Sequence, residues 1–262
     1  MAYNLAELDS ELADTLFAGK LHFLPSTGST NTDAMHAAHA GASHGSFYFA
    51  DEQTAGRGRG DHAWQSNAGQ GLYLSILLRP ALPLARLPLL PLAAGLAAVY
   101  AIHQSSGLVA DLRWPNDLLI GPKKAGGILI ESKTESGLIA YAVAGIGINV
   151  HQHAFPSDLA TPATSLDLAA GRPVSRQSLL VALLKSLERE VLLLAEPDAA
   201  TRIPARIEQA STWIHGRRVV VHGPQACTGV TEGLDEHGFL RVRAAQGIVR
   251  VQTGGLRDAE TS

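Results

Sequence analysis

The sequence predicts an α+β protein, in which a mixed central sheet has helices packed on one face and a small antiparallel β-barrel follows. Segments with apolar residues at helical spacing alternate with short apolar, strand-like segments over most of the 262 residues. After Trp213 the pattern changes to short strands separated by turns that contain glycine. The expected domains are therefore residues 1–211 and a β domain of residues 212–262.

The composition is that of a folded protein, with 46% hydrophobic and 17% charged residues. The formal net charge of −3 gives no overall attraction to nucleic acid or to an anionic membrane, and we expect neither as a partner. The most apolar run, Leu87 to Ile102, is broken by proline and glycine and is too short to span a bilayer. Cys227 is the only cysteine, which excludes a disulfide within the chain and favours a cytoplasmic location.

The first predicted elements are a helix from Leu5 to Leu16 and a strand from Leu21 to Leu24. We expect no helix-turn-helix domain before this strand, because such a domain needs several more helices. A second helix follows, in which Thr30 and Asp33 resemble a capping box and Gly41 suits the end. Either this is a well-capped surface helix, or its free N–H groups and hydroxyls hold a ligand anion or amide.

Predicted strands at Phe47 to Asp51 and Leu72 to Leu78 flank the loop around which the sequence is organised, Gln53 to Trp64. In this loop three glycines at every second position alternate with Arg57 and Arg59. Glycine lets an anion approach backbone N–H groups, and arginine adds donors suited to carboxylate and phosphate. The loop therefore suits a ligand with several negative charges, although an ordinary polar connection between strands has a similar composition.

A buried helix is predicted from Arg86 to Ser105, followed by a short strand from Leu108 to Leu112. Pro115 favours an extended bend after this strand, so that Asn116 and Asp117 project from its end. These two residues either form an Asx turn or bind a nucleotide or metal.

The run Lys123 to Gly127 is predicted to be a tight turn that leads into a hairpin of Ile128 to Glu131 and Leu138 to Val143. Lys124 becomes a site candidate if it points into the same pocket as the two arginines. In Gly145 to Asn149, two glycines allow close approach of a neighbouring chain or a flat ring.

The remaining segments are a loop from Thr161 to Pro173 and an amphipathic core helix from Ser175 to Ala195. The β domain has four predicted strands: Arg218 to His222, Gly229 to Leu234, Phe239 to Arg243 and Ile248 to Gln252.

Four blocks in order resemble the signature blocks of biotin protein ligases: Gly56-Arg57-Gly58-Arg59 with Trp64, Trp114-Pro115-Asn116-Asp117, Lys124-Ala125-Gly126-Gly127-Ile128-Leu129, and Gly145-Ile146-Gly147-Ile148-Asn149. The resemblance covers nearly the whole chain. It implies a class II synthetase-like central sheet, an SH3-like C-terminal barrel, and a short form that lacks the N-terminal DNA-binding domain of some members.

The resemblance also implies an activity. Such enzymes activate biotin with ATP to biotinyl-5′-AMP, release pyrophosphate, and transfer biotin to a specific lysine of a biotin carboxyl carrier protein, a subunit of acetyl-CoA carboxylase. The implied cofactors and substrates are ATP, biotin and Mg²⁺. The metal is expected to bind through the phosphates, with no protein ligand assigned, and a monomer or homodimer is expected.

The resemblance assigns roles to individual residues, with Lys124 and Arg59 as the catalytic pair. Biotin-binding roles fall on Ser29, Thr30, Asn31, Gln53, Arg57, Gly58, Arg59, Lys124 and Gly126. ATP-binding roles fall on Arg57, Arg59, His62, Trp64, Asn116, Asp117, Lys124 and Asn149. Within these sets, Ser29, Thr30, Asn31 and Gln53 surround the ureido ring of biotin. Asn116 contacts phosphate or Mg²⁺, Asn149 contacts adenine, and Trp64 packs beside adenine or pins the loop.

Two positions depart from the family pattern. Asp61-His62 stands where Gly-Arg is usual, so that a histidine that is mostly neutral near pH 7 replaces an arginine. Arg113 stands where lysine is usual, which keeps the charge but changes its geometry. Because Lys124 is retained, we still expect activity.

Three alternatives remain. A lipoate–protein ligase or octanoyl/lipoyl transferase has a similar fold and also acylates carrier lysines. A biotin-responsive DNA-binding repressor is disfavoured by the acidic charge balance. A non-catalytic biotin-binding or carrier-docking protein would not depend on Lys124 for adenylate formation.

Overall fold

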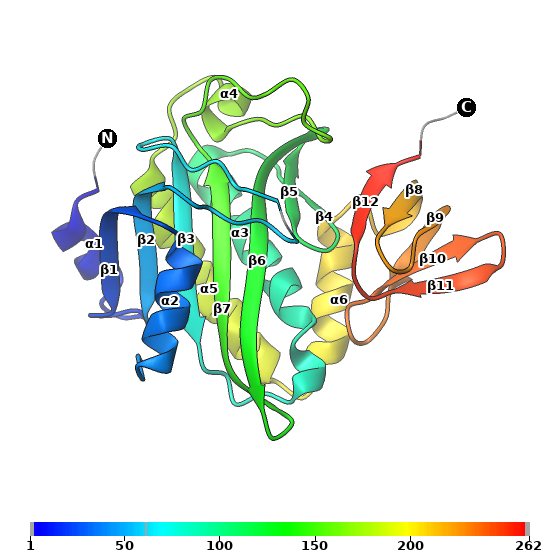
Figure 1. Ribbon diagram of the computed structural model, residues 1–262, viewed down its shortest axis with the longest axis horizontal. Coiled ribbons are helices and arrows are strands. Elements are labelled where there is room, and N and C mark those ends of the chain that lie inside the picture. Colours follow the sequence, from blue (N-terminus) through cyan, green and yellow to red (C-terminus); the bar gives the residue numbers. More distant parts are fainter. Residues whose placement is uncertain (1–2, 61, 260–262) are drawn as a thin grey trace.

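The computed structural model describes residues 3–60 and 62–259, and Asp61 therefore lies outside the described part of the chain. Within that part, seven strands form a mixed sheet with helices, and five further strands form an antiparallel sheet at the C-terminal end (Figure 1). This arrangement confirms the predicted α+β class with a barrel-like C-terminal unit.

The large sheet runs, from one edge to the other, through β1 (Leu21–Thr27), β2 (Phe47–Gln53), β3 (Gly71–Leu78), β7 (Leu138–Asn149), β6 (Lys123–Glu135), β5 (Asp117–Ile120) and β4 (Asp111–Arg113). Strand β1 pairs with β2 in parallel, and every other neighbouring pair in this order is antiparallel. Because parallel neighbours need a crossover, the helix between β1 and β2 must lie against a face of the sheet.

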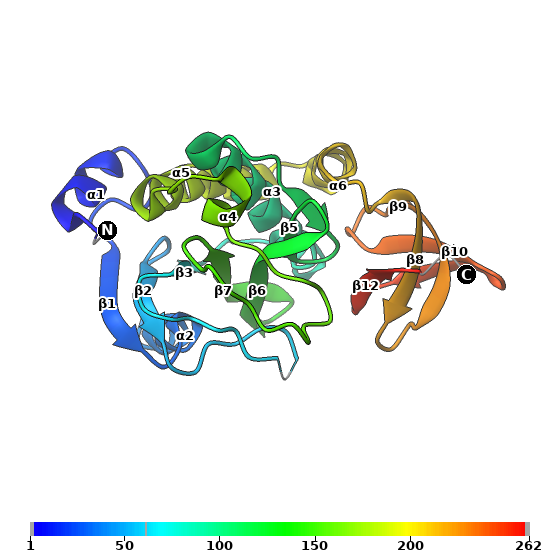
Figure 2. The same ribbon diagram turned by 90° about the horizontal axis from the view of Figure 1, so that it is seen from above.

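The helices are α1 (Leu5–Glu11), α2 (Thr30–His39), the 3-10 turn η1 (Leu84–Arg86), α3 (Leu89–Ser106), α4 (Leu166–Ala170), α5 (Arg176–Ala195) and α6 (Ala199–Ala210). Helices α3 and α5 pack on one face of the large sheet, as predicted, whereas α2 lies on the opposite face (Figure 2). No helix within residues 3–60 and 62–259 is long and apolar enough to cross a membrane.

Side chains that alternate along the strands divide the core between these two faces. Phe47 and Phe49 belong to the large core that includes α3 and α5, while Tyr48 packs with α2 in a second, smaller core. Helix α2 has 10 residues, which is shorter than α3 with 18. It covers only part of its face, and the rest of that face is left for the loops that form the site.

Several predicted boundaries differ from the structure. The tight turn expected at Lys123 to Gly127 lies instead at residues 121–122, because Gly121 adopts a positive φ of 56°, and β6 begins at Lys123. The loop predicted from Thr161 to Pro173 contains α4. Helix α6 was not predicted, since Pro204 lies inside it and interrupts its helical pattern.

The C-terminal sheet has the strand order β11 (Gly247–Val251), β10 (Leu240–Ala244), β9 (Cys227–Leu234), β8 (His215–His222) and β12 (Gly255–Asp258). Strand β12 extends the four strands predicted from sequence. The C-terminal sheet docks against the part of the chain that forms the large sheet through Gly238, whose carbonyl accepts a hydrogen bond of 3.0 Å from Trp114 Nε1. In Figure 1 it lies at the β4–α6 end of the molecule, far from the N-terminus.

Candidate active site

A cavity of about 1030 Å³ lies on the α2 side of the large sheet, beyond the N-terminus of that helix. Ser75 and Leu77 point to the same face because side chains alternate along β3, and Leu77 packs with α2 while Ser75 lines the cavity. The other walls are the loop of residues 54–66, the ends of β5 to β7, and turns of the C-terminal sheet. Its volume lies at the upper end of ligand pockets and suits two joined substrates.

Nearly all the residues assigned by the family resemblance line this one cavity. These are Ser29, Thr30, Asn31, Gln53, Arg57, Gly58, Arg59, His62, Trp64, Asn116, Asp117, Lys124 and Asn149. Gly126 is the exception: a Cβ added there would lie 2.8 Å from Gly147 O and 2.9 Å from Leu118 Cδ1, and it is the neighbouring Gly127 that lines the cavity. Segments separated by more than 100 residues thus converge on one space.

At the N-terminus of α2, buried hydroxyl and amide groups form a hydrogen-bonded cluster. Thr30 donates from its backbone N and its Oγ1 to Gln53 Oε1, at 2.9 and 3.0 Å. Ser75 Oγ donates to Asn31 Oδ1 at 2.6 Å and lies 2.7 Å from Thr30 Oγ1. The predicted capping box is wrong: Ser29 is the N-cap without a side-chain bond, and Asp33 accepts from Thr27. The hydroxyl of Thr30 instead contacts Gln53 and Ser75 in the cavity wall.

The two glycines of β7 make room for side chains that lie flat on the sheet. A Cβ added at Gly145 would lie 2.2 Å from Asn31 Oδ1, and one at Gly147 would lie 2.7 Å from Trp64 Nε1. Since real Cβ contacts are longer, any larger residue would displace these two side chains. The close approach predicted from this glycine pair is therefore made by Asn31 and Trp64.

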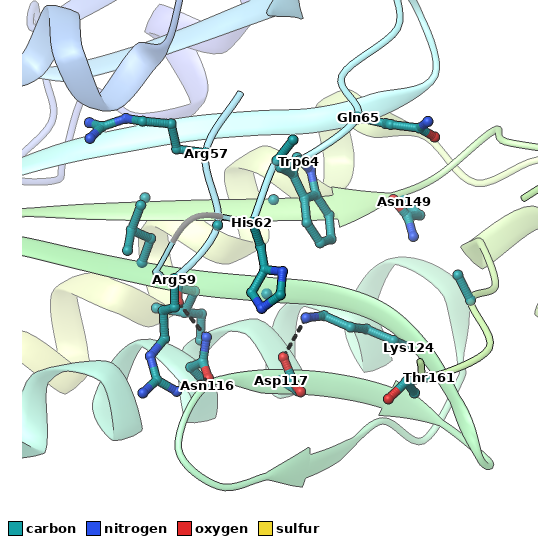
Figure 3. A pocket seen from close by; sticks show the side chains of 18 of the residues that line it. Arg57, Arg59, His62, Trp64, Gln65, Asn116, Asp117, Lys124, Asn149 and Thr161 are labelled. Atoms are coloured by element: carbon teal, nitrogen blue, oxygen red, sulfur yellow. Dashed lines mark hydrogen bonds and ion pairs between the residues drawn. The ribbon is translucent and has the colours of Figure 1, made fainter. Parts of the chain in front are cut away.

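Lys124 and Asp117 form the most tightly held charged pair in the cavity. Lys124 Nζ lies 2.5 Å from Asp117 Oδ1 (Figure 3). Arg113 Nη2 lies 2.7 Å from Oδ2 of the same carboxylate. Burial by itself raises the pKa of Asp117, but the charges of Lys124 and Arg113 and their hydrogen bonds outweigh it and hold that pKa below its usual range. Asp117 is therefore a carboxylate that holds the Lys124 ammonium in the cavity.

The two loop arginines point in different directions. Arg59 Nη1 donates to Asn116 Oδ1 and to the carbonyl of Gly254, both at 2.9 Å, and so joins the loop to the C-terminal sheet. Burial lowers the pKa of Arg59, an effect that the Asp117 charge offsets in part. Arg57 extends away from Lys124 (Figure 3) and pairs with Glu131 at 2.7 Å. Of these two arginines, only Arg59 bonds a residue adjacent to Asp117.

The other expected ATP-binding residues are also held by protein contacts. Asn149 is 6% exposed and its Nδ2 donates to Thr164 O at 3.0 Å, while its Oδ1 accepts from Gln152 at 3.3 Å. The Trp64 ring lies 5.6 Å from Lys124 Nζ, and its buried Nε1 has no hydrogen-bond partner among the described residues. The Trp64 indole thus lies against β7 at Gly147, close to the Lys124 side chain.

The two departures from the family pattern have different surroundings. His62 is exposed in the loop that borders the cavity, while the adjacent Asp61 lies outside the described residues. Arg113 is 7% exposed and its Nη2 bonds Thr161 at 2.9 Å as well as Asp117. Arg113 therefore lines the cavity itself and also orients Asp117.

Some contributors were missed by sequence reasoning. Ser75, Gln152, Thr161 and Arg257 line the cavity, and Glu131 contacts two residues that do. Ser75 could have been found, because it is a polar residue inside the otherwise apolar strand β3. Arg257 gave no local signal, since it comes from the C-terminal sheet.

Comparison with known proteins gives consistent matches. Residues 23–149 match the Biotin/lipoate A/B protein ligase family. The bifunctional ligase/repressor BirA of Bacillus subtilis is 41% identical over 163 residues, which cover 62% of this chain and 50% of that protein. The chain thus spans about half the length of that relative.

Other relatives are matched over most of their length. The biotin–[acetyl-CoA-carboxylase] ligase of Mycobacterium tuberculosis is 34% identical over 90% of this chain and 88% of its own. The structure of the biotin protein ligase from Aquifex aeolicus in complex with biotin and ATP superposes with a TM-score of 0.79 and 30% identity, covering 92% of this chain and all of that one. The cavity and these similarities lead to one conclusion: the chain belongs to the biotin/lipoate A/B protein ligase family, among its biotin protein ligases.

Proposed function

We propose that this chain is an ATP-dependent biotin protein ligase, which forms biotinyl-5′-AMP and transfers the biotinyl group to a lysine of a carrier protein. The observation that carries the proposal is the pairing of two kinds of subsite in one cavity. One is the neutral cluster of Ser29, Thr30, Asn31 and Gln53, and the other is the charged cluster of Lys124 and Arg59. A neutral ring and an anionic reacting centre on one substrate fit this combination.

In the first step, a carboxylate oxygen of biotin attacks the α-phosphorus of ATP. An O–P bond forms, the bond to the β-phosphate oxygen breaks, and pyrophosphate leaves. Both reactants are anionic, so a cation must lie at their meeting point. We assign this role to Lys124, whose Nζ lies 2.5 Å from Asp117 Oδ1 in the cavity. Arg59, bonded to the neighbouring Asn116, supplies the second positive charge. The loop that Trp64 pins to the sheet excludes water, which would hydrolyse the mixed anhydride.

In the second step, the neutral amine of a carrier lysine attacks the acyl carbon of the adenylate. An amide bond forms, the acyl–phosphate bond breaks, and AMP leaves with the electron pair while the amine loses a proton. We propose that the carrier is a biotin carboxyl carrier domain, supported by the name of the Mycobacterium tuberculosis relative. The lone Cys227 supports action in the reducing cytoplasm.

Mg²⁺ is proposed to enter with the phosphates of ATP. Within residues 3–60 and 62–259 no group of three or more His, Cys, Asp or Glu side chains could hold a metal. Asp117 and Asn116 are the oxygen-bearing side chains beside Lys124 and Arg59, but both already accept hydrogen bonds from cations. These residues fit an ion held mainly by phosphate oxygens and water, as is usual for Mg²⁺. When bound, it would neutralise charge on the pyrophosphate leaving group.

The decisive experiment incubates the protein with biotin, MgATP and a biotin carrier domain and measures both the adenylate and the labelled lysine. Lys124→Ala should slow adenylate formation on the order of 100-fold, because it removes the cation that stabilises the transition state. Lys123→Ala is the matched control, since Lys123 is exposed on the same strand and does not line the cavity. An unchanged rate in Lys124→Ala would refute the assignment.

The same assay tests lipoate ligation as the rival activity. The ureido ring of biotin has N–H donors and a carbonyl acceptor, whereas the dithiolane ring of lipoate has neither. The side chains of Thr30, Asn31 and Gln53 are neutral donors and acceptors, which supports biotin. Lipoate should therefore not compete with biotin, and efficient lipoate transfer would favour the rival.

A further inference from the structure

Glu131 on β6 makes the contact that links the ligand loop to the ring subsite. Its Oε2 accepts a hydrogen bond of 2.7 Å from Arg57 Nη2 and one of 2.8 Å from Asn31 Nδ2. Arg57 belongs to the loop and Asn31 to α2, and the two are brought together on one carboxylate oxygen. Glu131 itself is not among the residues that line the cavity.

From Asn31 the hydrogen bonds continue through the cavity wall and return to the loop. Asn31 Oδ1 accepts from Ser75, which lies 2.7 Å from the hydroxyl of Thr30. Thr30 donates from its backbone N to Gln53 Oε1 at 2.9 Å, and Gln53 Nε2 donates to Ser66 Oγ at 2.8 Å. The chain of contacts therefore joins two points of the loop through the residues proposed to hold the biotin ring.

The two hydrogen-bond partners of the Asn31 side chain, Ser75 and Glu131, differ in whether they determine the orientation of its amide group. A hydroxyl group such as that of Ser75 can donate or accept, so it does not determine how the Asn31 amide is turned. A carboxylate only accepts, and it therefore forces Nδ2 toward Glu131 and Oδ1 toward Ser75. Asn31 is 4% exposed, and an inverted amide would place its buried Oδ1 against the Glu131 carboxylate, where neither oxygen can donate.

We propose that Glu131 is a positioning residue that fixes the Asn31 amide for the biotin ring and anchors the loop through Arg57. This inference rests on the proposed function. The ureido ring presents donors and an acceptor in fixed positions, so a correctly turned amide strengthens its binding. It also assigns Arg57 a different task from Arg59, because Arg57 acts through Glu131 and not at the phosphates.

Glu131→Gln tests the inference with little change of shape. Glutamine can turn either its oxygen or its NH₂ group toward Asn31, so the amide orientation is no longer determined. The dissociation constant for biotin, measured by calorimetry without ATP, and the KM for biotin should both rise about tenfold, as expected for the loss of one charge-assisted hydrogen bond. The KM for ATP and kcat at saturating biotin should stay within about twofold. Glu135→Gln is the matched control, because it removes the same charge from an exposed position on the same strand.

A double-mutant cycle with Arg57→Gln completes the test. If Arg57 acts through the Glu131 carboxylate, the double variant should bind biotin with about the affinity of whichever single variant binds it less tightly. Biotin affinity of Glu131→Gln within twofold of wild type, an equal rise in the KM for ATP, or additive effects would each overturn the role of Glu131. Wild-type protein that binds biotin and forms no adenylate would refute the proposed function, while the calorimetric comparison would still decide the role of Glu131.

Discussion

At Asp117, one carboxylate serves two cations that differ in exposure. Both residues line the cavity, but the side chain of Arg113 is 8% exposed and that of Lys124 is 29% exposed, so the lysine is the more accessible of the two. Because Arg113 occupies Oδ2, Lys124 is directed to Oδ1. The arginine that replaces the family's usual lysine thus fixes the position of the carboxylate that in turn fixes Lys124.

The lowered pKa of Asp117 predicts a specific dependence of stability on pH. A carboxylate whose pKa is lower in the folded protein stabilises the fold above its unfolded pKa of about 3.9, and this contribution is lost as the pH falls through the folded pKa. Asp117→Asn should lower the free energy of unfolding at pH 7 by about 3 kcal/mol, because it leaves two cations without their partner. Urea titrations at pH 7 and pH 3 check this: the difference from wild type should shrink at pH 3. An equal difference at both pH values would contradict it.

Among the elements, β7 determines how closely the loop and α2 can approach the sheet. It alternates Val143, Gly145 and Gly147 on the face that α2 partly covers. Val143 packs under α2, whereas the two glycines accept Asn31 and Trp64 against the backbone. Along this face of β7, a large side chain therefore packs in the core at Val143, and glycines leave space for the cavity residues at Gly145 and Gly147.

Gly147→Ala tests this role of β7. The added Cβ would lie 2.7 Å from Trp64 Nε1, so the indole must move and the loop should lose its attachment to the sheet. We expect faster tryptic cleavage after Arg57 and Arg59 and a KM for ATP raised by about tenfold. Gly28→Ala is the control, because a Cβ there meets nothing within 4 Å. Equal cleavage rates in both variants would argue against Trp64 as the pin.

The elements also show what local sequence can predict. The apolar run of β3 and the amphipathic pattern of α5 arise from neighbouring residues, and both elements were predicted nearly to their ends. Helix α6 escaped prediction because Pro204 breaks the local pattern, although Ile203 and Ile207 are buried at helical spacing. Helix α2 connects the parallel strands β1 and β2, and the direction of this crossover determines which face of the sheet it covers. The residues of α2 alone could not predict that face.

For the whole molecule, the C-terminal sheet forms part of the wall of the candidate active-site cavity. Arg59 reaches the carbonyl of Gly254, and Gly238 packs against Leu89 and Leu92 of α3 with a carbonyl bonded to Trp114. These contacts join segments more than 100 residues apart, so the pattern of neighbouring residues in the sequence does not predict them. The sequence therefore predicted most of the residues that gather at the cavity, but not that Arg57 pairs with Glu131 while Arg59 pairs with the C-terminal sheet.

Gly238→Ala should loosen this docking. Its φ is +78°, and a Cβ would lie 2.6 Å from Leu92 Cδ1 and 3.0 Å from Leu89 Cδ2. We expect a larger radius of gyration by small-angle scattering and slower adenylate formation, because Arg59 loses its anchor. Gly247→Ala is the control, since its φ of +118° imposes similar backbone strain with nothing within 4 Å. Identical scattering profiles for the two variants would contradict the docking role of Gly238.

The placement of Lys124 inside a strand has a consequence for altering this protein. Its backbone N donates to Pro162 O at 2.8 Å and its carbonyl accepts from Thr164 N at 2.9 Å, while Leu119 flanks it on β5. Because the Lys124 backbone is held by hydrogen bonds on one side and by β5 on the other, its ammonium group can move only by rotation within its own side chain. A longer β5–β6 connection or a different ligand loop would therefore not move this positive charge. A design for another acid substrate would have to place the substrate carboxylate near Lys124.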